Sequence, residues 1–157
     1  MKIRRDAEGD LWVEALAPVC ADTLLHVPDW LSSDDPAVKD RLVPGGSSDP
    51  EADAAWRKFG SPEVARLFLS NREIMKRDLE SLEPQGKKGF RLKIPRGHES
   101  AWLSGLNAAR HALFLLKKID ARDLNADIET VEDDARREAL VRLSILGWLQ
   151  HEIIENG

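Results

Sequence analysis

The 157-residue sequence predicts a mostly α-helical fold, a bundle of about five helices with a small antiparallel β element. Three observations predict this class. Apolar residues recur at helical spacing along most of the chain, a capping residue precedes proline at three places, and strand-like segments are few and short. The hydrophobic fraction of 42% is sufficient for a core without disulfides or metal ions. We therefore expect one domain over residues 1–157.

The first sixteen residues predict an extended N-terminal hairpin. Residues 2–5 and 10–15 flank a short connection that contains glycine, and Trp12 and Val13 have good strand propensity. A lone hairpin is marginal in water, so it needs helices or a third strand. Residues 89–94 supply the candidate third strand, with apolar side chains facing inward and basic ones facing water.

Helices are predicted for most of the remaining chain. A helical pattern follows Pro18, although Pro28 could interrupt it. Three later helices are predicted to begin where a side-chain acceptor caps the free amides and proline takes the first helical position. These three starts are Asp35–Pro36, Asp49–Pro50 and Ser61–Pro62.

Three long helices are predicted from Ser61 to the end of the sequence. The helix that begins at Ser61–Pro62 is expected to reach Glu83, and the next runs from about Gly97 to Ile119. A polar connection over 120–129 follows. Thr130 then offers a cap for the last helix, which continues to the end of the chain.

Several short blocks of sequence resemble an uncharacterised bacterial family, domain of unknown function 2017 (DUF2017). The resemblance lies in residues 101–110 and 147–150, and it extends to 34–36, 49–52 and 90–94. It implies a helical domain with a minor sheet, and it brings no established activity. Members of that family in some bacteria are encoded beside an adaptor of the Clp protease and are sometimes labelled regulators. The resemblance therefore implies a link to regulated proteolysis.

Composition excludes several classes of function. A formal net charge of −5, from 23 basic and 28 acidic residues, disfavours nucleic-acid binding over the whole surface, though not by a local patch. The single cysteine, Cys20, cannot form an internal disulfide and is expected to be buried. We find neither a signal peptide nor a membrane-spanning segment, so we expect a cytoplasmic protein without a membrane partner.

No catalytic, cofactor-binding or metal-binding residues are assigned from the sequence. The four histidines are scattered, and none lies three or four positions from another. The pair His151–Glu152 begins like a zinc-protease helix but lacks the second histidine ligand. No nucleophile elbow is present. A small-molecule enzyme with a site assembled across helices stays an alternative.

A ten-residue segment is strongly basic and contains no acid. Two interpretations are open: an edge that binds nucleic acid or an acidic partner, or a solvated strand edge whose lysines prevent association between sheets. Charges without stacking aromatics predict weak, salt-sensitive nucleic-acid binding. An acidic stretch within residues 120–134 could neutralise the segment within one molecule or in a dimer. The basic residues are Lys87, Lys88, Arg91, Lys93 and Arg96.

The residues that carry the family resemblance suggest a polar groove between the last two long helices. The groove would be lined by tryptophan and could recognise a peptide, or it could be a satisfied contact between helices. The leading hypothesis is accordingly a non-catalytic interaction or regulatory protein with a protein partner, and a homo-oligomer stays open. The predicted groove residues are Trp102, Asn107, Arg110, Trp148 and Gln150.

Overall fold

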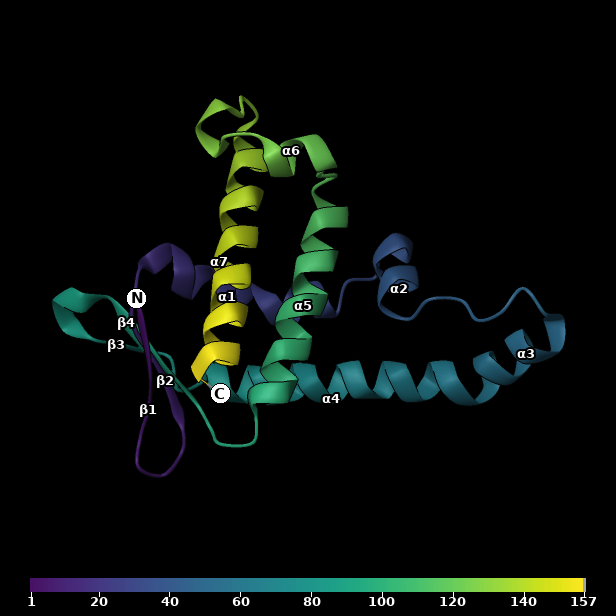
Figure 1. Ribbon diagram of the computed structural model, residues 1–157, viewed down its shortest axis with the longest axis horizontal. Helices are drawn as coiled ribbons and strands as arrows, with labels where there is room; N and C mark the ends of the chain where they lie inside the picture. Colours follow the sequence, from purple (N-terminus) through teal and green to yellow (C-terminus); the bar gives the residue numbers. More distant parts are fainter. Residues whose placement is uncertain (157) are drawn as a thin grey trace.

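The computed structural model describes residues 1–156, which form a mostly α-helical fold with a small antiparallel sheet at one side. Helices α5 and α7 lie side by side, and α4 crosses them and extends well beyond α5 (Figure 1). The α-helices are α1 (Pro18–Leu31), α2 (Pro36–Leu42), α3 (Pro50–Ala55), α4 (Ser61–Leu79), α5 (Glu99–Leu116), α6 (Ala121–Asn125) and α7 (Asp134–Asn156).

The sheet has the strand order β1-β2-β4-β3, and all neighbouring pairs are antiparallel. Its strands are β1 (Lys2–Arg5), β2 (Leu11–Leu16), β3 (Glu83–Pro84) and β4 (Phe90–Ile94). The expected hairpin and third strand are thus confirmed. The two-residue strand β3 is an addition that the sequence pattern did not predict.

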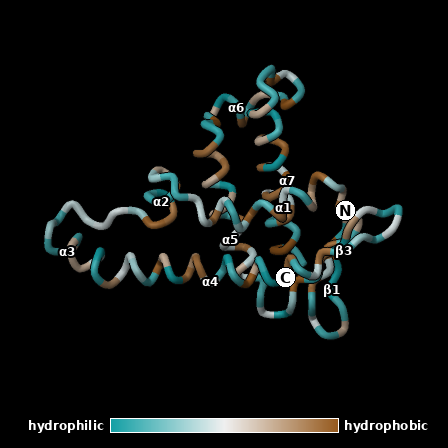
Figure 2. Tube along the Cα trace, turned by 180° about the vertical axis from the view of Figure 1, so that it is seen from behind, coloured by the Kyte–Doolittle hydropathy of each residue, from teal (hydrophilic) through white to brown (hydrophobic). Residues whose placement is uncertain are grey.

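One face of the sheet packs against the helices because strand side chains alternate between faces. Leu11, Val13, Leu92 and Ile94 are fully buried on this inner face. They join a single core with residues of α1, α4, α5 and α7. Brown, hydrophobic stretches of the chain mark this region in Figure 2.

Two of the three predicted helix starts are confirmed in detail. The carboxylate of Asp35 accepts a hydrogen bond from the amide of Ala37, and that of Asp49 accepts one from Ala52. α4 begins at Ser61 as predicted, but the predicted cap is wrong. A π-helical turn, Trp56–Gly60, joins α3 to α4, so Ser61 lies inside a continuous helical segment and makes no capping hydrogen bond.

The predicted cap of the last helix is also wrong. Thr130 ends a short 3-10 turn, Ile128–Thr130, and Asp133 takes the capping role by accepting a hydrogen bond from the amide of Arg136. Pro28 does not interrupt α1. Cys20 is buried as expected, and burial raises the pKa of its thiol.

Glycine allows the close crossing of α4 and α5. A Cβ atom at Gly105 would collide with the sulfur of Met75, which is itself fully buried. Close to this crossing, the buried carboxylate of Asp78 in α4 accepts a hydrogen bond from Trp102 in α5. Packing and one buried polar contact therefore fix the base of α4, whereas its other end projects from the body.

Candidate functional site

The projecting part of the molecule is formed by α3, the π-helical turn and the first half of α4. We call this segment, residues 50–70, the arm; it extends away from α5 and α7 (Figure 1). Phe59, Leu67 and Leu69 on the arm are 66%, 55% and 56% exposed. Single exposed apolar residues are ordinary, but several large ones on one projecting segment make the arm a candidate binding surface.

A groove of about 560 Å³ runs between the arm and α2. Val38 is buried at its base, while Phe68 and Leu69 form the wall that belongs to α4. The size lies within the roughly 300–1,000 Å³ of ordinary binding clefts. An apolar surface between two helices is suited to a third helix, because an amphipathic helix buries its apolar stripe in such a groove.

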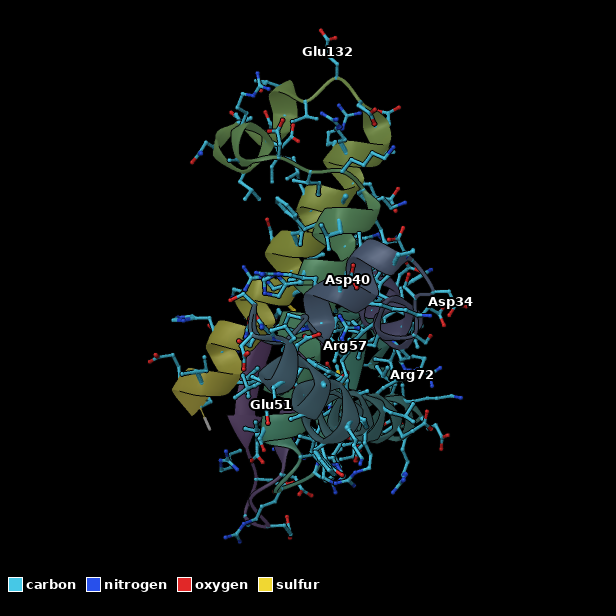
Figure 3. The ribbon with its side chains drawn as sticks, turned by 90° about the vertical axis from the view of Figure 1, so that its right-hand side faces the viewer. Asp34, Asp40, Glu51, Arg57, Arg72 and Glu132 are labelled. Carbon is cyan, nitrogen blue, oxygen red and sulfur yellow. The ribbon has the colours of Figure 1, made fainter. Side chains whose placement is uncertain are left out.

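Charged residues of both signs surround the groove, among them Asp34, Asp40, Arg57 and Arg72 (Figure 3). Asp40 and Lys39 come from α2, Arg57 comes from the arm, and Arg72 follows the arm on α4. The hydrogen bond with Asp53 is the main cause that raises the pKa of Arg57, and Asp40 adds a smaller contribution. A polar border around an apolar centre is typical of protein interfaces.

Trp56 holds the arm to the loop that precedes it. Its indole Nε1 donates a hydrogen bond to the carbonyl oxygen of Pro44 at 3.0 Å, and its ring packs directly against Gly60. Asp53 accepts a hydrogen bond from the amide of Gly46 at 3.2 Å. Residues 44–46 are therefore attached to the arm by these contacts, and the groove has a fixed outer end.

The basic segment does not form one patch. Lys87 and Lys88 lie in the turn before β4, and Arg96 lies after it, where its backbone amide donates to Asp10. Arg91 and Lys93 point to the outer face of the sheet. Arg91 pairs with Glu83 and Lys93 pairs with Asp10, each at 2.6 Å.

The outer face of the sheet contains an aromatic residue that the sequence analysis did not connect with the basic segment. The ring of Trp12 lies 5.2 Å from the guanidinium of Arg91, 5.6 Å from that of Arg4 and 5.8 Å from the amine of Lys93. The alternation of residues in β2 placed Trp12 on this face, but only the strand register brings it beside β4. The premise that the segment lacks a stacking aromatic is thus wrong.

The acidic stretch lies far from the basic segment. It forms α6 and the turn after it at one end of α5 and α7, whereas the sheet lies near the other end (Figure 1). Asp123 pairs with Arg136 at 3.6 Å, and Asp134 pairs with Arg137. Neutralisation of the basic segment by this stretch within one molecule is therefore contradicted.

The structure separates the five residues of the predicted polar groove. Arg110 donates a hydrogen bond from Nη1 to the side-chain oxygen of Gln150 at 2.9 Å, and it lines a cavity of about 300 Å³ with Trp148. Asn107 is exposed, and Trp102 is buried against α4. Arg110, Trp148 and Gln150 are thus brought together, and their role in binding stays a prediction.

Asp78 and His98 form a carboxylate–histidine pair of the kind that some catalytic sites use. The Nδ1 atom of His98 donates to Asp78 Oδ2 at 2.9 Å, and Trp102 Nε1 donates to the same oxygen at 2.8 Å. Within residues 1–156 the ring of His98 has no other hydrogen-bond partner. The pair joins the C-terminal end of α4 to the start of α5, which is a structural role.

The described part of the chain offers neither a metal-binding cluster nor a membrane-spanning helix. Residues 1–156 contain no group of three or more histidine, cysteine, aspartate or glutamate side chains that could hold a metal ion. None of the helices described is both long enough and apolar enough to cross a membrane.

Comparison with known proteins identifies one family. Residues 4–156 match the family described as Domain of unknown function (DUF2017). No curated protein and no solved structure matches the chain.

Proposed function

The chain belongs to the DUF2017 family, and we propose that it is a non-catalytic interaction protein that binds an amphipathic helix of a partner protein between α2 and the arm. The observation that carries this proposal is the groove of about 560 Å³ between α2 and the arm, which is lined in part by Leu69, a leucine that is 56% exposed. Regulated proteolysis is the pathway that the family resemblance suggests for the partner.

The groove favours a helix over an extended peptide. It lies between two helices, and its sheet-free walls offer no strand edge for backbone hydrogen bonding. The charged side chains of both signs around the groove can orient a helix that itself carries charge. Leu69, which lines the groove, would become buried on binding.

The test is capture of partners from a lysate by the purified protein, with Leu69→Glu and Ile154→Glu as a matched pair of variants. Both positions are exposed, 56% and 60%, but Ile154 lies on α7, away from the arm. Burying one leucine contributes about 1.5–3 kcal/mol, so Leu69→Glu should weaken capture at least tenfold. Ile154→Glu should capture the partner as the native protein does.

Two results would contradict the proposal. Equal capture by both variants would show that the partner binds elsewhere. A native protein that is dimeric by light scattering, and that becomes monomeric in Leu69→Glu, would show that the groove accepts a second copy of the chain. A partner that survives nuclease treatment and is lost only with Leu69→Glu would support it.

A second candidate function, a nucleic-acid-binding regulator, is favoured by the position of Trp12. A base could stack on this ring while Arg4, Arg91 and Lys93 contact the backbone. The double variant Arg91→Glu/Lys93→Glu should then lower affinity for single-stranded RNA, and native affinity should fall steeply with salt. Arg66→Glu/Arg77→Glu on α4 makes the same change in net charge and is the control. Affinity that does not vary with salt would reject this candidate.

A further inference from the structure

A second cavity, separate from the groove beside the arm, lies where α2, α5, α6 and α7 meet. Its volume is about 410 Å³, near the lower end of the roughly 300–1,000 Å³ range of small-molecule sites. Three basic side chains and four apolar ones surround it. The lining residues are Arg41, Arg110, His111, Phe114, Leu115, Leu124 and Leu143.

The charge of this cavity is not balanced by the protein. No aspartate or glutamate lines it. Across the part of the chain that the structure describes, neither Arg41 nor Arg110 forms an ion pair, although the whole chain carries a net charge of −5. Many other arginines do have carboxylate partners: Arg4, Arg5, Arg57, Arg66, Arg72, Arg91, Arg136, Arg137 and Arg142.

The pKa of His111 depends on the burial and the charges around this cavity. Burial lowers the pKa of its imidazole, and the positive charges of Arg41 and Arg110 lower it further. Burial disfavours a charge of either sign, so only the contribution of Arg41 and Arg110 favours a negative charge here. Together with the two guanidinium groups that lack a carboxylate partner, this contribution favours an anion in the cavity.

Arg110 is held across the mouth of the cavity. Its Nη1 atom donates to Gln150, and the guanidinium lies close to Gly147 on α7. Guanidinium groups carry five N–H donors. The other donors of Arg110 make no hydrogen bond to residues 1–156, so they can bind a ligand.

We infer that this cavity binds a small amphipathic anion, a carboxylate attached to a short apolar body. The carboxylate would lie between Arg41 and Arg110, since guanidinium donors match the geometry of two carboxylate oxygens. The apolar body would pack against Phe114, Leu115 and Leu143. Leu124 is 56% exposed and would become covered by the ligand. This site is independent of the groove beside the arm.

The experiment titrates the full chain with octanoate and, as an uncharged match, with 1-octanol, followed by NMR of the His111 ring. Octanoate should bind at least tenfold more tightly than octanol. Octanoate should also raise the pKa of His111, because the bound carboxylate offsets the two guanidinium charges. Equal affinity for the two probes, or no binding of octanoate below the concentration at which it forms micelles, would overturn the inference.

Substitutions then test the position of the site. Arg41→Met/Arg110→Met should weaken octanoate binding at least tenfold, while Arg66→Met/Arg77→Met on α4 should leave it unchanged. Leu124→Glu, at an exposed position, adds a carboxylate to the cavity and should also weaken binding, even if the arginine variant does not fold. Octanoate affinity that is unchanged in Leu124→Glu and in a folded arginine variant would show that the anion binds elsewhere.

Discussion

The indole Nε1 of Trp102 donates a hydrogen bond to the carboxylate of Asp78 at 2.8 Å, and both residues are almost completely inaccessible to water. The bond joins the buried C-terminal end of α4 to α5. His98 donates to the same carboxylate, so the carboxylate of Asp78 accepts hydrogen bonds from two side chains. A buried network of this kind is stable only when all its members are satisfied.

Asp78→Ala should therefore destabilise the fold by about 1–3 kcal/mol, because the buried indole N–H loses its acceptor. The same substitution should be less harmful when Trp102 is already phenylalanine, since phenylalanine has no N–H to leave unpaired. Urea unfolding of the two single variants and the double variant measures this coupling. Glu80→Ala, at an exposed neighbouring position, is the control and should change stability by no more than about 0.5 kcal/mol. Equal costs of Asp78→Ala in both backgrounds would contradict the role of the bond.

Two glycines in helices are expected to respond to alanine in opposite directions. At Gly105 an added methyl group meets the sulfur of Met75 at the α4–α5 crossing, so Gly105→Ala should destabilise the protein by about 1–3 kcal/mol. At Gly147 the methyl group would lie 3.7 Å from Arg110, which is an ordinary contact. Gly147→Ala should stabilise α7 by about 0.5–1 kcal/mol, because alanine has the higher helix propensity. Thermal unfolding compares the two: an unchanged or raised midpoint in Gly105→Ala would contradict the packing at the crossing, and a lowered midpoint in Gly147→Ala would contradict the expected gain in helix propensity.

The stability of the protein should depend on pH through His111. Its pKa is lowered in the folded state, first by burial and then by Arg41 and Arg110, so the unfolded chain takes up the proton at higher pH than the folded chain does. The contribution of this residue is constant above its ordinary pKa of about 6.5 and is lost as pH falls below that value toward the folded pKa. His111→Gln should reduce the loss of stability in this window. His151→Gln, at an exposed position, serves as the control, and identical pH profiles for native protein and His111→Gln would refute the prediction.

The attachment of the arm to its preceding loop should depend on Gly60. A side chain there would displace the ring of Trp56, which also holds the loop through Pro44. Gly60→Ala should therefore speed proteolytic cleavage within residues 43–49 while the unfolding midpoint of the core stays the same. Gly45→Ala is a matched control in the loop itself, because nothing lies within 4 Å of an added methyl group. Cleavage at equal rates in the two variants would show that Trp56 does not hold the loop.

Local sequence signals predicted much of the fold, and they failed where distant contacts decide the structure. Asp35 and Asp49 cap their helices because capping depends only on the next few residues. Ser61 carries the same signal, but the preceding helix does not end there: a π-helical turn joins it to α4, and the packing of Trp56 against Gly60 stabilises this turn. Strand β3 has only two residues, too few to show any alternation.

The candidate sites depend even more on tertiary structure. The exposure of Leu69 cannot be predicted from the spacing of apolar residues along α4. The same spacing would also be found in a helix that is buried along its whole length. Arg41 reaches the second cavity only because α2 packs against α5. The pairing of Arg110 with Gln150 could be anticipated from the sequence, since each residue lies in a predicted long helix and in a block that resembles the family.

The register of the sheet limits how early the protein can fold during its synthesis, because β2 cannot pair with β4 before β4 has been made. Trp12 pairs with Lys93, which is about 80 residues later, and a ribosome that adds about 5–20 residues per second needs roughly 4–16 s to reach it. Until β4 is made, Leu11 and Val13 lack the strand that pairs with β2 in the folded protein. Charged residues beside an apolar strand hinder its pairing with other chains. We therefore expect the basic residues of β1 to reduce aggregation of the nascent chain until β4 has been synthesised.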